Sequence, residues 1–209
     1  MKQQQQFHLS IIDAQKSMAP EIASLIMQAM NEDCCRFFAG PRHTLDDFRT
    51  LMTDLVEQEE SQYSYLNTQV AVDTDGQVMG SCSSYDGGRL HALRRAFITG
   101  AFRAFGQDFS DMADETRSGE LYIDSLAVKE SFRHRGIATA LLRSAQEKAR
   151  RLHLPAVGLL VDTGNPKAEH LYVSLGFHYV DEASWGSHPM KHLQFDLKPA
   201  SASAPRRGE

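Results

Sequence analysis

The sequence predicts an α/β fold, in which helices flank a central mixed, mainly antiparallel sheet of about six or seven strands. Three patterns carry this prediction. Near the N-terminus, Phe7, Leu9 and Ile11 alternate with polar residues, as in a strand with one buried face. After Pro20, apolar residues recur at helical spacing. Within residues 65–85, two β-rich runs meet at a turn of sequence Asp-Thr-Asp-Gly, which is typical of a hairpin.

Helices and strands continue to alternate after the hairpin. The further elements that we expect are a helix after Thr44, a strand over 121–128, a helix over 136–152, a strand over 156–161, a helix over 165–175, and strands over 177–180 and 193–197. The side chains of Thr44 and Asn165 can cap the helices that follow them, and Gly176 suits a helix end.

The chain is expected to form a single domain over residues 1–197, followed by a disordered tail over 198–209 that is rich in Ala, Ser and Pro. Residues 86–119 form a predicted helical insertion between the third and fourth strands. Its first half is apolar at helical spacing, and its second half is acidic. One interpretation is a helix packed on the sheet and then a solvated loop; the other is a lid over a substrate cleft.

Composition excludes several classes of protein. The net charge of −5 and the pI near 6.0 argue against nucleic-acid binding, which needs a basic face. No apolar run reaches the roughly 18–20 residues of a membrane span, and no signal segment follows Met1. Cys34, Cys35 and Cys82 give an odd count without CxxC spacing, which disfavours disulfides and a cysteine zinc site. His188 and His192 flank Pro189 and also make a poor metal site. We therefore expect a cytoplasmic protein without a metal.

A strand, a glycine-containing turn and a helix start follow one another at Arg133-His134-Arg135-Gly136. The unpaired N–H groups of a first helical turn and the helix dipole attract an anion such as a phosphate. The basic side chains of this turn add positive potential. An ordinary basic turn with a structural glycine remains the alternative.

These residues resemble the acetyl-CoA signature of the GNAT superfamily of N-acetyltransferases. The signature is a Leu126-Ala127-Val128 strand followed by Arg133-x-x-Gly136-x-Ala138 and two leucines. The second family signature follows about 40 residues downstream, at Asn165, Ala168, Leu171, Tyr172, Gly176 and Phe177. Together the two motifs cover roughly residues 120–180. Glu130 replaces a common proline and His134 a common glycine, and neither change removes a backbone donor.

The resemblance implies a GNAT-like fold, whose two central parallel strands splay apart, and direct transfer of an acetyl group from acetyl-CoA to a primary amine. The implied cofactor-binding residues are Leu126, Ala127, Val128, Arg133, His134, Arg135, Gly136, Ile137, Ala138, Thr139, Asn165 and Tyr172. Main-chain amides from Arg133 to Thr139 would bind the diphosphate, and the backbone of Leu126 and Val128 would pair with the pantetheine arm.

Three catalytic residues are candidates. The resemblance implies that Tyr172 protonates the leaving thiolate, although Tyr172 also falls on an apolar stripe and could be a core residue. Alternation along the strand puts Tyr122, Asp124, Leu126 and Val128 on one face, which makes Asp124 the leading general base. Glu120 is its rival, and a purely structural Asp124 is an open alternative.

The predicted partner is a small-molecule amine or a protein amino group. The acidic residues Asp86, Asp108, Asp111, Asp114 and Glu115 would suit a cationic small molecule. A homodimer is left open by the sequence. Two other functions are also open: a non-catalytic acyl-CoA sensor or interaction module, and a nucleotide-binding regulator that uses the same turn.

Overall fold

The computed structural model describes residues 8–185 and 188–197, so Phe7 and the predicted tail over 198–209 lie outside the described residues. The strands are β1 Ser10–Asp13, β2 Thr68–Val72, β3 Val78–Asp86, β4 Glu120–Val128, β5 Ala156–Asp162, β6 His178–Trp185 and β7 His188–Asp196. The helices are α1 Ala19–Met30, α2 Glu32–Ala39, α3 Leu45–Glu57, α4 Leu90–Phe105, α5 Ile137–Arg151 and α6 Pro166–Ser174. Short 3-10 helices lie at Lys16–Met18, Tyr65–Asn67, Gly87–Arg89 and Glu130–Phe132.

The described strands form one seven-stranded sheet in the order β1-β2-β3-β4-β5-β7-β6. β4 and β5 pair in parallel, and every other neighbouring pair is antiparallel. This confirms the predicted mixed, mainly antiparallel sheet. The strands β6 and β7 are longer than predicted, because many of their residues are polar and only partly buried, so an apolar pattern does not mark their full length.

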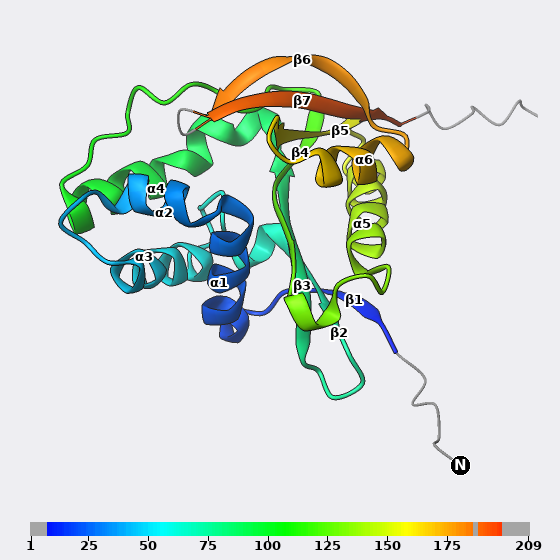
Figure 1. The fold of residues 1–209 in the computed structure, drawn as a ribbon, viewed down its shortest axis with the longest axis horizontal. Coiled ribbons are helices and arrows are strands. Elements are labelled where there is room, and N and C mark those ends of the chain that lie inside the picture. Colours follow the sequence, from blue (N-terminus) through cyan, green and yellow to red (C-terminus); the bar gives the residue numbers. More distant parts are fainter. Residues whose placement is uncertain (1–7, 186–187, 198–209) are drawn as a thin grey trace, which may run out of the picture.

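Helices cover both faces of the sheet. Figure 1 shows α1 to α4 on one side and α5 and α6 on the other. Each side has its own apolar core: Ile22, Phe38 and Phe97 belong to the first, and Leu141 and Val157 to the second. The sheet therefore separates two apolar layers.

Local signals set most helix ends. The Thr44 hydroxyl accepts a hydrogen bond from the Asp47 N–H, and the Asp47 carboxylate accepts one from the Thr44 N–H, so α3 begins with a capping box. Helix α2 is an addition to the predicted elements. It has only eight residues and follows α1 directly, so its apolar stripe is too short to separate from that of α1 by periodicity.

The insertion contains the predicted helix, but its acidic half is not solvated throughout. Glu115 is 4% exposed and Thr116 is 8% exposed. The Arg94 guanidinium, itself buried, lies 3.1 Å from the Glu115 carboxylate. Because this ion pair compensates its charge, Glu115 can be buried, and the solvated-loop interpretation is wrong at this end of the loop.

A β-bulge interrupts β4 at Asp124. Ser84 of β3 pairs with Ile123, whereas the preceding Ser83 pairs with Ser125, so Asp124 is an extra residue in its strand. The extra residue changes which side chains share a face: Leu126 packs with Ile123 on the α5 side of the sheet. The predicted common face of Tyr122, Asp124, Leu126 and Val128 is therefore wrong, since period-two alternation fails across a bulge.

Candidate active site

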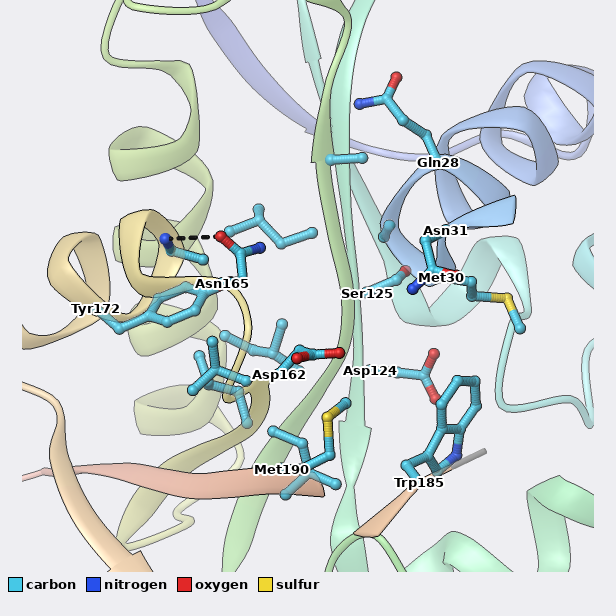
Figure 2. A pocket seen from close by; sticks show the side chains of 18 of the residues that line it. Gln28, Met30, Asn31, Asp124, Ser125, Asp162, Asn165, Tyr172, Trp185 and Met190 are labelled. Carbon is cyan, nitrogen blue, oxygen red and sulfur yellow. Dashed lines mark hydrogen bonds between the residues drawn. The ribbon is translucent and has the colours of Figure 1, made fainter. Parts of the chain in front are cut away.

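The parallel strands β4 and β5 separate part-way along their length. Their pairing runs from Glu120 opposite Ala156 to Ile123 opposite Leu159, and ends there. Beyond that point the two strands and the neighbouring α1, α6 and β7 line a cavity of about 470 Å³. Figure 2 shows this cavity with β4 running through it, Tyr172 and Asn165 on one side and Asp124 and Ser125 on the other. The splay of the sheet therefore opens a passage between its two faces.

The turn before α5 forms an anion cradle. Gly136 has φ +78° and occupies the N-cap position, and no side-chain hydrogen bond caps α5 within the described part of the chain. The first-turn N–H groups are thus available to an outside acceptor. A Cβ added to Gly136 would meet no described atom within 4 Å, so there is room for a bulky anion. These residues fit the diphosphate of coenzyme A.

Two side chains hold the end of β4 beside this cradle. Nε of Arg133 donates to the Val128 carbonyl at 3.3 Å, and Nε2 of Gln28 donates to the same oxygen at 3.0 Å. Both side chains line the cavity. These contacts fix the turn before α5 and α1 against the end of β4.

Helix α6 brings Tyr172 to the cavity. Oδ1 of Asn165 accepts a hydrogen bond from the Ala168 N–H at 3.2 Å and caps the helix, with Pro166 at its start. The Tyr172 ring is half-buried beside the ring of Phe177, with centroids 5.9 Å apart. Burial raises the pKa of Tyr172 to about 12. The hydroxyl therefore stays protonated at neutral pH.

Asp124 lies on the opposite side of the splay. Its Oδ2 accepts a hydrogen bond from Nε2 of Gln62 at 3.1 Å, and the same Nε2 lies 3.4 Å from Oε1 of Glu115. Glu115 also accepts hydrogen bonds from Tyr85 and Trp185, at 3.1 and 2.8 Å.

Two carboxylates thus share one amide donor, and only one of them is well compensated. The desolvation of Asp124 and the nearby Glu115 charge raise the pKa of Asp124 well above its usual range, against the hydrogen bond from Gln62. Desolvation also raises the pKa of Glu115, but the charge and hydrogen bond of Arg94 and the hydrogen bonds from Tyr85 and Trp185 oppose this. Of the two, Asp124 is the group that takes up a proton.

Most of the predicted site residues surround the cavity. Leu126, Ala127, Val128, Arg133, Ala138, Asn165, Tyr172 and Asp124 line it. His134, Arg135, Gly136, Ile137 and Thr139 form the adjoining turn and the first turn of α5. His134 has φ +60°, so it holds the left-handed conformation that a glycine would adopt without strain.

Glu120 does not line the cavity. Its carboxylate, fully buried, accepts hydrogen bonds from Thr116 at 2.6 Å and Gln194 at 2.9 Å, and pairs with His192 at 2.9 Å. It occupies the space over Gly158, where an added Cβ would lie only 2.0 Å from Oε2. Burial raises the pKa of Glu120, but the bonds from His192, Thr116 and Gln194 outweigh it and leave the pKa lowered. The structure thus gives Glu120 a role in joining β4, β5 and β7.

Sequence reasoning did not single out several side chains at or near the cavity, among them Gln62, Ser125, Asp162 and Trp185. Asp162 had a signal, because it ends a parallel strand, and ligands bind at the carboxyl ends of parallel strands. Gln62, Ser125 and Trp185 have none, since they join the site through contacts between distant segments.

Residues 8–185 and 188–197 contain neither a metal-binding cluster nor a membrane-spanning helix. No group of three or more His, Cys, Asp or Glu side chains there could hold a metal ion. No helix in that part of the chain combines the length and apolar character needed to cross a bilayer.

Comparison with known sequences gives partial matches to curated proteins. A 74-residue stretch is 35% identical to GCN5-related N-acetyltransferase 4, chloroplastic, of Arabidopsis thaliana, covering 34% of this chain and 25% of that protein. A 66-residue stretch is 39% identical to acetyltransferase Atu2258 of Agrobacterium fabrum. It covers 32% of this chain and 47% of that protein. The chain thus matches at most about half the length of these relatives.

Similarity to solved structures extends over most of the chain. A crystal structure described as that of an acetyltransferase is 26% identical, with a TM-score of 0.71 over 90% of this chain and 100% of that one. An N-acetyltransferase from Staphylococcus aureus Mu50 has a TM-score of 0.76 over 88% of this chain and 99% of its own. At 23% identity, this similarity shows the fold alone. The sequence profile of the acetyltransferase (GNAT) family matches residues 26–177, well over half of the chain. The chain therefore belongs to the GNAT family of acetyltransferases.

Proposed function

We propose that this chain is an N-acetyltransferase that transfers the acetyl group of acetyl-CoA to a primary amine by direct attack. One observation carries the proposal: the splay between β4 and β5 separates a group that takes up a proton, Asp124, from one that keeps a donatable proton, Tyr172. Acyl transfer from a thioester to an ammonium group needs both, one for the nucleophile and one for the leaving thiolate.

The cradle and the strand bind the acetyl donor. When bound, acetyl-CoA supplies the acetyl group as a thioester. The uncapped amides at the start of α5 bind its diphosphate, with the Arg133 side chain alongside. The backbone of Leu126 and Val128, on the splayed part of β4, binds the pantetheine arm as an added strand would.

Asp124 prepares the nucleophile. An alkyl ammonium with a pKa near ~10.4 is neutral in only about one molecule in 10³ at pH 7, so its deprotonation needs help. A carboxylate with a raised pKa is a stronger base than an ordinary aspartate, and Asp124 has such a pKa. It accepts the amine's protons and passes them to solvent.

Tyr172 completes the transfer. As the C–N bond forms and the C–S bond breaks, the Tyr172 hydroxyl gives a proton to the thiolate and then regains one from solvent. A main-chain N–H on β4, that of Val128 or its neighbour, stabilises the charge on the carbonyl oxygen. The ammonium gives up two protons in all. One is balanced by the new thiol proton, and the other is released.

The acceptor side of the cavity suits a cation. Three carboxylates, Glu115, Asp124 and Asp162, line the cavity, and Trp185 and Met190 supply apolar wall. The insertion contributes Glu115, which supports a role for residues 106–119 in covering this side. Similar folds occur in a spermidine N-acetyltransferase chimera and in a NatC complex bound to Gag peptide and CoA. We therefore include both small amines and protein amino groups among the acceptors.

The location of the reaction is also part of the proposal. Cys34, Cys35 and Cys82 are free and buried. Burial raises the pKa of the Cys82 thiol to about 12, so it stays a neutral core side chain. Free cysteines of this kind suit a reducing compartment such as the cytoplasm.

The test combines binding and turnover. Acetyl-CoA is titrated calorimetrically, and amide exchange is followed over residues 133–139. Thiol release is then measured with phenethylamine, putrescine, Nα-acetyl-lysine and a tetrapeptide with a free N-terminus. We expect binding, protection of these amides and release of thiol with at least one amine. Binding without turnover would favour the sensor, whereas binding of ATP in place of acetyl-CoA would favour the nucleotide-binding regulator.

A further inference from the structure

The hydroxyl of Ser125 is buried, and it has no hydrogen-bond partner among the described residues. The residue is only 5% exposed, yet it lines the cavity. A buried hydroxyl without a partner costs free energy, and native proteins keep few such groups. A ligand in the cavity is the natural partner for this one.

The bulge explains how Ser125 reaches the acceptor side. In a regular strand, neighbouring side chains point to opposite faces of the sheet. Asp124 is the extra residue of the bulge, so it and Ser125 both lie on the side of α1, as Figure 2 shows. Met30 and Asn31 also line the cavity, and Figure 2 shows them on the same side of β4. The strand thus presents a carboxylate and a free hydroxyl side by side.

These two groups match the hydrogen-bonding pattern of a primary amine. Once its first proton is lost, a primary amine has one lone pair and two N–H groups. Asp124 accepts one N–H, and that proton leaves as the C–N bond forms and the C–S bond breaks. The other hydrogen stays on nitrogen in the amide product, and a hydroxyl oxygen can accept a bond from it throughout.

We propose that Ser125 is a specificity-determining residue: its Oγ accepts the retained N–H of the acceptor, so that the lone pair points into the opening between β4 and β5. The proposal rests on the proposed function. It assigns the preference for primary over secondary amines to one side chain. A secondary amine has no second N–H for Ser125, and its N-alkyl group would lie against a hydroxyl that stays unpaired.

The experiment compares Ser125→Ala with a matched control, Ser81→Ala. The Ser81 hydroxyl is equally buried and unpartnered within the described residues, but it lies on β3 outside the lining of the cavity. The two probes are the panel amine with the highest kcat/KM and its own N-methyl derivative. Turnover is measured for both, and calorimetry gives the affinity of each amine for enzyme saturated with coenzyme A.

We expect Ser125→Ala to lower kcat/KM for the primary amine about tenfold, as the loss of one hydrogen bond predicts. The N-methyl amine should be unaffected, so the preference of the enzyme for the primary amine falls about tenfold, in turnover and in affinity. Ser81→Ala should keep the preference, and both variants should melt at or above the temperature of the unmodified chain.

Three results would count against the role of Ser125. An unchanged preference in Ser125→Ala, with turnover intact, overturns it and leaves the acetyltransferase activity standing. Equal losses on both amines would give Ser125 a structural role only. If the unmodified chain turns over no amine, the proposed function fails and the inference falls with it.

Discussion

The Gln62 side chain bonds to Asp124: its Nε2 donates to Oδ2 at 3.1 Å. The same nitrogen lies 3.4 Å from Glu115, which also pairs with Arg94. Gln62 therefore fixes the carboxylate of the proposed base and links it to a buried ion pair. The charge of Glu115 therefore helps to set the pKa of Asp124.

Glu115→Gln should move the pH profile. The Glu115 charge raises the pKa of Asp124, and Arg94 lowers it, so removing only the negative charge lowers that pKa. Asp124 acts as a base when ionised, and the acid limb of log(kcat/KM) against pH should therefore shift to lower pH. Glu147→Gln, which removes an exposed carboxylate that pairs with Arg150, is the control. If the acid limb does not shift in Glu115→Gln, Asp124 is not the general base.

Tyr172→Phe should separate catalysis from binding. The substitution keeps the ring contact with Phe177 and removes only the hydroxyl. We expect kcat to fall roughly 10²-fold, because general acid catalysis contributes at least that much, while the affinity for coenzyme A stays the same. Tyr179→Phe, at an exposed position of β6, should change neither quantity. Unchanged turnover in Tyr172→Phe would mean that Tyr172 is only a core residue on the apolar stripe of α6.

Gly136→Ala and Gly76→Ala form a matched pair that tests the anion cradle. Both glycines have φ +78°, and an added Cβ at either meets no described atom within 4 Å. Each substitution should lower the free energy of unfolding by about 1–2 kcal/mol, because alanine is strained in the left-handed region. Only Gly136→Ala should weaken coenzyme A binding in calorimetry, since Gly76 lies in the β2–β3 turn. Equal affinities in the two variants would rule out a diphosphate at the start of α5.

The fold was largely predictable because its signals are local. The capping box at Thr44, the cap at Asn165 and the glycine before α5 each lie within a few residues of the helix that they start. The order of strands and helices follows from these starts and from apolar periodicity. The cavity-lining residues Arg133 and Tyr172 could be named for the same reason, as each belongs to a short motif.

The acceptor side was not predictable in the same way. The bulge at Asp124 appears only when β4 pairs with β3, and it alone puts Ser125 beside that carboxylate. The burial of Glu115 depends on Arg94 from α4 and Trp185 from β6, which no local pattern connects. Such features arise from the register of distant segments.

The pair of His192 and Glu120 predicts a pH dependence of stability. Burial lowers the pKa of His192, but the hydrogen bond and charge of Glu120, with those of Asp181, outweigh it and raise the pKa. Because the pKa of His192 is higher in the folded chain than in the unfolded chain, protonated His192 stabilises the fold. This contribution is complete below the unfolded pKa of about 6.5, and it is lost as pH rises through the folded pKa. The pKa of Glu120 is lower in the folded chain, so ionised Glu120 also stabilises the fold. This contribution is complete above the unfolded pKa of about 4.3, and it is lost as pH falls through the folded pKa.

Both contributions are therefore complete between about pH 4.3 and 6.5. His192→Gln can keep a hydrogen bond to Glu120 but not the charge. Its deficit in the free energy of unfolding, measured by urea titration, should be largest in that window and should shrink as pH rises towards 9. His178→Gln is the control, because His178 lies at an exposed position and 3.8 Å from Asp196. A deficit for His192→Gln that is constant from pH 5 to 9 would mean that His192 is neutral in the folded chain, and that the buried Glu120 charge is held by its neutral donors alone.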